Sequence, residues 1–240
     1  MSDFAQHTYD VRLEWGMAAV EHLAQDVDCI VVIDVISFAT CVSIAVDRGA
    51  MLLPYPVKGQ PAEAYAHLKR AKLAHAERRV NDAEFSLSPQ SLLTLPADYR
   101  LVLPSPNGSA ITFKAKETAA TIFCASLRNL QATAAVCQKF SRILLVPCGE
   151  RWPDGSLRPA LEDLTAAGGI AAGLRGKQLS PEAQAAAALY QHSDLSRLKD
   201  CGSARELIGR GFARDVDLCL QQNVSSLACI LKNDAFIAAA

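Results

Sequence analysis

Several catalytic signatures are missing from this sequence, and each absence excludes a class of enzyme. It contains no Walker phosphate loop, no GxGxxG, no HExxH, and no Cys followed by five residues and Arg. These patterns mark P-loop nucleotide sites, dinucleotide sites, zinc peptidases and tyrosine phosphatases. The stretch Asp34-Val35-Ile36 lacks the second Asp of the haloacid dehalogenase phosphatases, and the five histidines are scattered, which argues against zinc.

An excess of charge of either sign is also missing. Lys plus Arg number 24 and Asp plus Glu number 25, so no overall field attracts the protein to nucleic acid or to a membrane surface. No apolar run is long enough to span a bilayer, and the stretch "MSDFAQHTYD" lacks the features of a secretory signal, so we expect a cytoplasmic protein. The eight cysteines form no CxxC pair, which favours reduced thiols in the core.

Strands and helices alternate along the chain. Half of the residues are apolar, which suffices for a large core. The run "DCIVVIDV" is typical of a strand buried on both faces, a helix is predicted over 38–48, and "AMLLPYP" predicts a second strand. We therefore predict an α/β fold with three α/β/α layers around a largely parallel or mixed sheet. We expect one domain over residues 1–240, with two similar β-α-β lobes as the alternative organisation.

One carboxylate is predicted at the end of the first buried strand. Ligands of such sheets bind beyond the carboxyl ends of the strands, where helix N-termini carry free N–H groups. Asp34 lies at such a position and is followed by Ser37 and Thr40. An isolated Asp there is more often a cap or turn residue than a catalyst, but the apolar Val35-Ile36 that follows weakens the capping interpretation. Metal binding is the functional alternative.

Three other polar stretches are expected at strand ends, and one of them is "CGE", from Cys148 to Glu150. The loop "SPNGSA" is either a turn with a helix cap or a cradle for an anion, in which Asn107 and Ser109 join the backbone of Gly108. The stretch "SLRN", from Ser126 to Asn129, follows a later strand in the same way.

Charged pairs follow in the last third of the chain. Glu162 and Asp163 open a predicted helix, where the helix dipole favours acids, although one of them could also bind Mg²⁺. Arg158, in the turn-rich loop before them, is a candidate for anion binding, yet a solvated surface arginine is commoner. Arg214 and Asp215 are most often a surface pair, and only a position beside the strand-end carboxylate would make them site residues.

Six stretches occur in an order that resembles the 2-phosphosulfolactate phosphatase family. Each motif alone is weak, and the resemblance rests on their order over about residues 29–224. The stretches are "VVIDVISFAT", "FSLSP", "SPNGSA", "ASLRN", "CGERW" with "GSLRPALEDLTAAG", and "ARELIGRGFARDV".

The resemblance implies a Mg²⁺-dependent phosphatase, related to coenzyme M biosynthesis, that hydrolyses 2-phosphosulfolactate to sulfolactate and phosphate. It implies that Asp34 is a metal ligand or a nucleophile; attack by water and an aspartyl phosphate both stay open. The other implied residues are Glu162, Asp163 and Asp215 for Mg²⁺, Ser126 and Asn129 for catalysis, and Ser37, Thr40, Asn107, Gly108, Ser109, Arg128, Arg158 and Arg214 for the substrate.

One departure from the family pattern concerns the substrate. Many members carry Arg-Ala-Thr/Ser after the Asp-Val-apolar triplet, whereas this chain has Ser37-Phe38-Ala39-Thr40, so a different small phosphorylated acid is also an expected substrate. The alternative function is an inactive α/β scaffold that binds a small phosphorylated or carboxylated metabolite. A hydrolase or transferase that uses Ser37 or Ser126 is a third hypothesis, with no His nearby in the sequence to act as base. We expect a homodimer, the commonest assembly of soluble enzymes.

Overall fold

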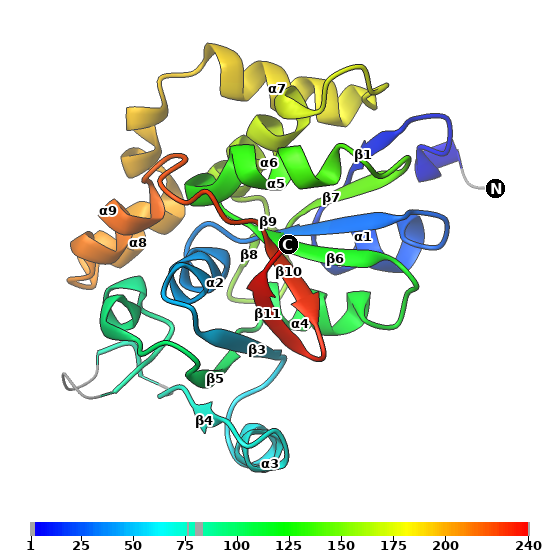
Figure 1. Ribbon diagram of the computed structural model, residues 1–240. Coiled ribbons are helices and arrows are strands. Elements are labelled where there is room, and N and C mark those ends of the chain that lie inside the picture. The colour runs from blue at the N-terminus through cyan, green and yellow to red at the C-terminus, as the bar shows by residue number, and fades with distance from the viewer. Residues whose placement is uncertain (1–2, 76, 80–83, 240) are drawn as a thin grey trace.

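The apolar run after Asp28 forms strand β2 (Cys29–Ile33) inside a mixed sheet (Figure 1). In the computed structural model, which describes residues 3–75, 77–79 and 84–239, all five residues of β2 are buried. Successive side chains of a strand point to opposite faces. Accordingly Ile30 and Val32 join one hydrophobic core, while Val31 and Ile33 join another on the other face. The prediction of a strand covered on both faces is confirmed.

The sheet consists of two parallel groups of strands joined by an antiparallel hairpin. β1, β7, β2 and β6 are parallel to their neighbours, and so are β3, β5 and β4. The hairpin β10–β11 pairs antiparallel with β6 on one side and with β3 on the other, so the two groups run in opposite directions. In order across the sheet the strands are β1 (Val11–Leu13), β7 (Ile143–Pro147), β2, β6 (Thr121–Ala125), β10 (Cys229–Lys232), β11 (Ala235–Ala238), β3 (Met51–Tyr55), β5 (Arg100–Pro104) and β4 (Lys72–Leu73).

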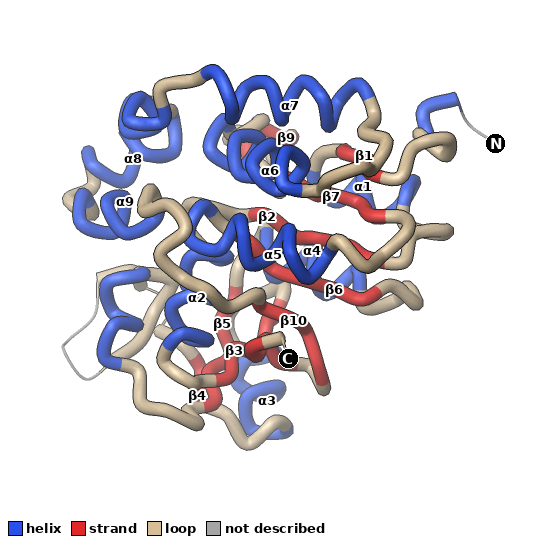
Figure 2. Tube along the Cα trace, turned by 45° about the horizontal axis from the view of Figure 1, so that its top comes forward, coloured by secondary structure: helices blue, strands red, loops and turns tan. Residues whose placement is uncertain are grey.

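Helices cover both faces, which confirms the predicted α/β/α layers. α5 (Leu130–Cys137), α6 (Leu161–Gly173) and α7 (Pro181–His192) lie together on one side (Figure 2). α1 (Gly16–Leu23), α2 (Phe38–Asp47) and α4 (Gly108–Ala115) share the core of the other side. The remaining elements are α3 (Gln60–Leu68), α8 (Gly202–Gly209), α9 (Ala213–Cys219), the short hairpin β8 (Glu150–Arg151) and β9 (Leu157–Arg158), and the 3₁₀ turns η1 (Asp3–Ala5), η2 (Pro89–Thr94), η3 (Leu127–Asn129) and η4 (Leu195–Asp200).

The two groups of strands do not lie in one plane. In a flat sheet, strands of opposite direction would end at opposite edges, yet the backbone N–H of Gly108, beyond β5, donates to Asp34, beyond β2, over 3.0 Å. The sheet therefore curves, and α2 packs inside the curve against β6, β3 and β11. Nine of the ten residues of α2 are buried, so the helix acts as a core element for both groups. The curvature brings the carboxyl ends of β2, β5 and β7 together.

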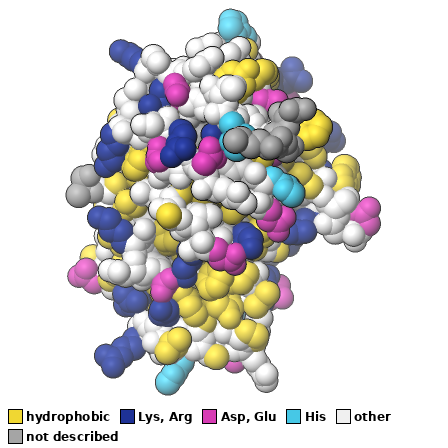
Figure 3. Space-filling model, turned by 90° about the vertical axis from the view of Figure 1, so that its right-hand side faces the viewer, with side chains coloured by type: hydrophobic (Ala, Val, Ile, Leu, Met, Phe, Trp, Pro, Cys, Tyr) yellow, Lys and Arg dark blue, Asp and Glu magenta, His cyan; other side chains and the backbone are white. Residues whose placement is uncertain are grey.

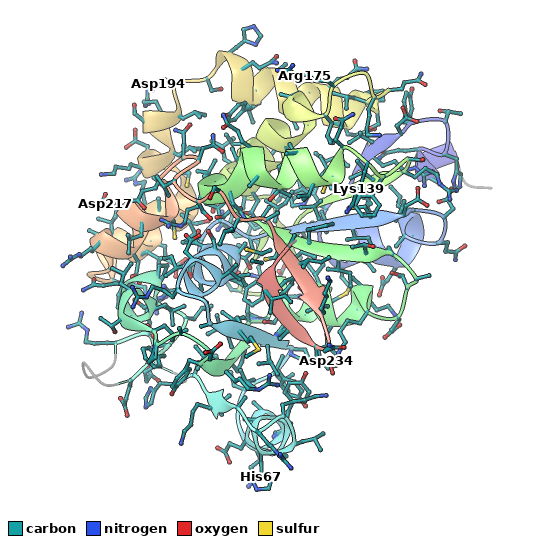
Figure 4. The ribbon with its side chains drawn as sticks, viewed as in Figure 1. His67, Lys139, Arg175, Asp194, Asp217 and Asp234 are labelled. Atoms are coloured by element: carbon teal, nitrogen blue, oxygen red, sulfur yellow. The ribbon has the colours of Figure 1, made fainter. Side chains whose placement is uncertain are left out.

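The tight turn of the β10–β11 hairpin is tied to two neighbouring helices. Asn233 and Asp234 both have positive φ angles, of 48° and 68°, as a type I′ turn requires. The Asp234 carboxylate pairs with Lys69 at the end of α3, over 2.6 Å, and with Lys116 at the end of α4 (Figure 4). These ion pairs fix the hairpin where it bridges the two groups of strands.

The surface carries charges of both signs. On the face shown in Figure 3, basic and acidic side chains are interspersed rather than separated into fields of one sign. No helix within the described residues combines the length and apolar character needed to cross a membrane. All eight cysteines are free and seven of them are buried, which confirms the predicted reduced core thiols.

Candidate active site

Asp34 lies between the N-termini of two helices. Its side chain is 5% exposed; Oδ1 accepts the N–H of Phe38 in the first turn of α2 at 3.1 Å, and Oδ2 accepts the N–H of Gly108 at the start of α4. Ser37, not Asp34, is the N-cap residue of α2, but the turn between β2 and α2 brings the Asp34 carboxylate back onto the N–H of Phe38. Asp34 thus contacts the start of the helix and also lines the cavity.

Gly108 is required by the close approach of α4 to Asp34. A Cβ atom at this position would lie 2.8 Å from Asp34 Oδ2 and would also overlap the ring of Phe38. The glycine of the Asn-Gly pair thus lets a backbone N–H reach the carboxylate, and the predicted substrate-binding role of Asn107, Gly108 and Ser109 stays a prediction. The neighbouring hydroxyl of Ser109 donates to the carbonyl oxygen of Leu103 at 2.7 Å, a bond that ties the first turn of α4 to strand β5.

Glu150, the first residue of β8 and three residues beyond β7, joins the same cavity. Its Oε1 accepts a hydrogen bond from Asn107 Nδ2 at 2.8 Å, so the loop after β5 contacts the loop after β7 as well as the loop after β2. Asn107 and Glu150 both line the cavity next to Asp34. The sequence places Glu150 in the strand-end stretch "CGE", but Glu150 was not assigned a catalytic, substrate-binding or metal-binding role.

Asp163 holds two of these loops together. It is buried in the first turn of α6; Oδ1 accepts the N–H of Val35 at 2.8 Å and Oδ2 accepts the N–H of Gly149 at 2.9 Å. One carboxylate therefore fixes the backbone directly after Asp34 to the backbone directly before Glu150. This contact gives Asp163 a positioning role whether or not it binds a metal.

Glu162 is buried beside Asp163 and faces a different partner. The thiol of Cys201, just before α8, donates to Glu162 Oε2 at 3.2 Å. Burial and the Glu162 charge raise the pKa of Cys201 to about 12, so this thiol stays protonated and can donate. Glu162 itself is not among the described residues that line the cavity.

The acids at this site perturb one another. Burial, followed by the charge of Glu150, raises the pKa of Asp34 to about 7, and the two backbone N–H donors offset only part of that rise. Burial and the charges of Glu162 and Asp34 also raise the pKa of Asp163 well above its usual range. Several carboxylates that destabilise each other's ionised form create a demand for a cation.

The cavity at the carboxyl ends of the strands has a volume of about 300 Å³. It contains acids from the strand ends and basic side chains from the loops around them. The described lining residues are Asp34, Ile36, Ser37, Lys58, Glu77, Arg78, Leu87, Ser105, Pro106, Asn107, Glu150 and Arg210. Three predicted site residues, Asp34, Ser37 and Asn107, thus share one cavity, and no histidine is among its described lining residues.

Arg78 connects two of the predicted residues. Its guanidinium donates to Ser37 Oγ at 2.9 Å and to Asp215 Oδ2 at 3.0 Å. Asp215 also accepts from Ser88 Oγ at 2.7 Å and from the N–H of Gln90 at 3.0 Å. Asp215 is therefore buried and paired with an arginine. Asp217, two residues later, is exposed at the outer edge of the molecule (Figure 4).

Ser126, Asn129 and Arg128 lie outside the described lining of the cavity. Asn129 Oδ1 accepts the N–H of Ser126 at 3.0 Å and Ser126 Oγ accepts the N–H of Arg128 at 3.3 Å, which forms a capping box at η3. Arg128 itself pairs with Asp47 at 3.3 Å and with Gln221. Their contacts in the structure stabilise the chain, and their predicted roles in catalysis and substrate binding stay predictions.

Three other residues predicted to bind the substrate also lie outside the described lining of the cavity. Thr40 is buried and donates to the carbonyl oxygen of Val35 at 2.8 Å. Arg158 donates to Ser203 Oγ at 2.9 Å, and Arg214 is exposed on α9. None of these three is among the described lining residues.

The comparisons with known proteins show the family of this chain. The family model described as 2-phosphosulpholactate phosphatase matches residues 18–234. The chain belongs to this family. A relative from Thermotoga maritima, named "Probable 2-phosphosulfolactate phosphatase", is 29% identical over 219 residues, which cover 86% of this chain and 90% of the relative. A relative of the same name from Thermotoga petrophila is 28% identical over 219 residues, which again cover 86% of this chain and 90% of the relative. The resemblance inferred from the six motifs is confirmed.

The donor set fits the Mg²⁺ that the sequence resemblance led us to expect. No group of three His, Cys, Asp or Glu side chains within the described residues is arranged to hold a metal. Mg²⁺ seldom needs such a cage, because it commonly binds one or two carboxylates and completes its octahedron with water and phosphate oxygens. Asp34 and Glu150 line the cavity, and each oxygen of Asp34 that accepts one backbone N–H retains a second lone pair.

Proposed function

We propose that this protein is a Mg²⁺-dependent phosphatase that hydrolyses a small anionic phosphomonoester. Membership of the 2-phosphosulpholactate phosphatase family supports the reaction class, and the names of the relatives make 2-phosphosulfolactate the first substrate to test. The products would be sulfolactate and phosphate. A cytoplasmic location, a homodimer and a link to coenzyme M biosynthesis are further predictions of the same proposal.

The observation that carries the proposal is the position of Asp34. It lies at the base of a cavity, oriented by N–H groups from the first turns of α2 and α4, with Glu150 close enough to raise its pKa. Bound Mg²⁺ would neutralise charge on the phosphoryl group. Asp34 and Glu150 would hold it, Asn107 would orient Glu150, and Asp163 would keep the loops after β2 and β7 in register.

The experiment is phosphate release from 2-phosphosulfolactate, 2-phospholactate and phosphoglycerates, measured with Mg²⁺ and with EDTA. We expect release that requires the metal, and we expect Asp34→Asn to abolish it while leaving the circular dichroism spectrum unchanged. Asp217→Asn is the matched control, because it removes an exposed carboxylate that pairs only at the surface with Lys199. A fully active Asp34→Asn protein would refute the proposal. Binding of these esters without release would instead favour the inactive scaffold.

A further inference from the structure

The cavity contains more basic groups than a metal-bound phosphoryl group requires. Lys58, Arg78 and Arg210 line it together with the acids already described. The acids at the ends of β2 and β7 suit a cation, whereas an arginine fork suits an oxyanion through paired N–H donors. The two kinds of group in one cavity indicate a ligand with two separate anionic ends.

Arg78 is the basic group with the most defined geometry. Its side chain is 13% exposed, and its partner Asp215 is 2% exposed. Two of its five N–H donors have acceptors among the described residues, on Asp215 and on Ser37, which follows Asp34 by three positions. Because Ser88 and the backbone of Gln90 fix Asp215, the guanidinium is anchored in one orientation at the cavity wall.

Two further arginines lie beside Arg78, around the ring of Phe212. The guanidinium carbons of Arg78, Arg79 and Arg210 lie 5.6, 5.7 and 5.8 Å from the centre of the Phe212 ring. Cation–π contacts stabilise such positions in part, but three arginines around one ring still repel each other. The Arg210 partner Glu206 is more than half exposed, so it offsets little of that repulsion. A bound anion would relieve the remainder.

We propose that Arg78, positioned by Asp215, binds a second oxyanion of the substrate, a carboxylate or a sulfonate, beside the phosphoryl group. This inference rests on the proposed phosphatase function and adds to it the residue that reads an acidic group on the alcohol part of the substrate. Asp215, expected from the resemblance to bind Mg²⁺, is here a positioning residue for the arginine.

The test measures affinity for a matched pair of ligands by calorimetry in the presence of Mg²⁺. 2-Phospholactate and isopropyl phosphate differ by a carboxylate on the same carbon skeleton. We expect the unmodified protein to prefer 2-phospholactate, and Arg78→Ala to reduce that preference by about 10- to 100-fold, the usual range for a charged hydrogen-bonded contact. Asp215→Asn should reduce it by a smaller factor, because the guanidinium remains but is no longer anchored.

The controls separate recognition from folding and from catalysis. Arg79→Ala also removes a guanidinium from the Phe212 ring but lies outside the described cavity lining, so it should keep the preference. If melting shows that Arg78→Ala is unfolded, Arg78→Lys keeps the charge without the fork and should still lose about 10-fold. An unchanged ratio in the folded Arg78 variant overturns the inference, as does an unmodified protein without preference. Phosphate release is scored separately: Arg78-dependent binding without turnover supports this inference while refuting the proposed function.

Discussion

Replacing Asp34 by Asn should change how the stability of this protein depends on pH. Burial and the charge of Glu150 raise the pKa of Asp34 to about 7, against about 3.9 in an unfolded chain. The folded state therefore holds the proton more tightly than the unfolded state. Stability falls as the pH rises from about 4 to about 7 and is level above that window. Three pKa units correspond to a loss of about 4 kcal/mol by pH 8.

The Asp34→Asn substitution removes this pH-dependent loss of stability and introduces a smaller loss that does not depend on pH. Both oxygens of Asp34 accept backbone N–H groups, from Phe38 and Gly108, whereas an amide has one acceptor and turns an NH₂ group toward the other N–H. An unsatisfied buried donor costs about 1–3 kcal/mol at every pH. The variant should therefore be less stable than the unmodified protein below about pH 5 and more stable above about pH 7.

Urea unfolding in EDTA, from about pH 4.5 to about pH 8.5, measures both curves. Asp217→Asn is the control, and its curve should run parallel to that of the unmodified protein, because Asp217 is exposed on α9. Mg²⁺ added at pH 8 should stabilise the unmodified protein and not Asp34→Asn, since the cation relieves a charge that the variant lacks. A constant difference between the two curves across the pH range would mean that Asp34 ionises with an ordinary pKa, and would refute the reasoning.

Three other substitutions test the packing and the charges of the site. Gly108→Ala should lower kcat by about 100-fold in the phosphate-release assay, because a methyl group there displaces the Asp34 carboxylate; Gly209→Ala, whose Cβ meets nothing within 4 Å, should leave kcat unchanged. Gly168→Ala should lower the melting temperature by several degrees, since its Cβ would overlap the backbone of α7 at a cost of about 1–3 kcal/mol, and an unchanged melting curve would contradict that packing. Glu150→Gln should lessen the loss of stability between about pH 4 and about pH 7 in EDTA, because the Glu150 charge helps to raise the pKa of Asp34; a steeper loss in urea unfolding would contradict this.

The elements with a strong local pattern were predictable from the sequence. The β-branched run of β2, the helix over 38–48 that ends before Gly49, and the strand β3 all lie where the sequence pattern indicates. The hairpin β10–β11 was not predicted from the sequence. Its signal was present: Asn233-Asp234 between two apolar runs is a typical pair for a type I′ turn.

The site was less predictable, for two physical reasons. Residues that depend on a long-range contact carry no local mark: Arg78 belongs to a loop with little periodicity, and its role emerges only from its bonds to Ser37 and Asp215. Conversely, polar residues at strand ends look alike in sequence whether they face a cavity or the backbone. Ser126 forms a helix cap whereas Asn107 lines the cavity, although each follows a strand in the same way.

The position of the β10–β11 hairpin between the two groups of strands sets the order in which the sheet can be completed during synthesis. Ribosomes release the chain from its N-terminus, and β6 and β3 are made long before residues 229–238 emerge. Until then each group presents an open strand edge, with unpaired N–H and C=O groups that can pair with another chain. Nascent chains that stall before the hairpin should therefore aggregate by edge-to-edge pairing, and chaperones that cover exposed strands should matter most in that interval.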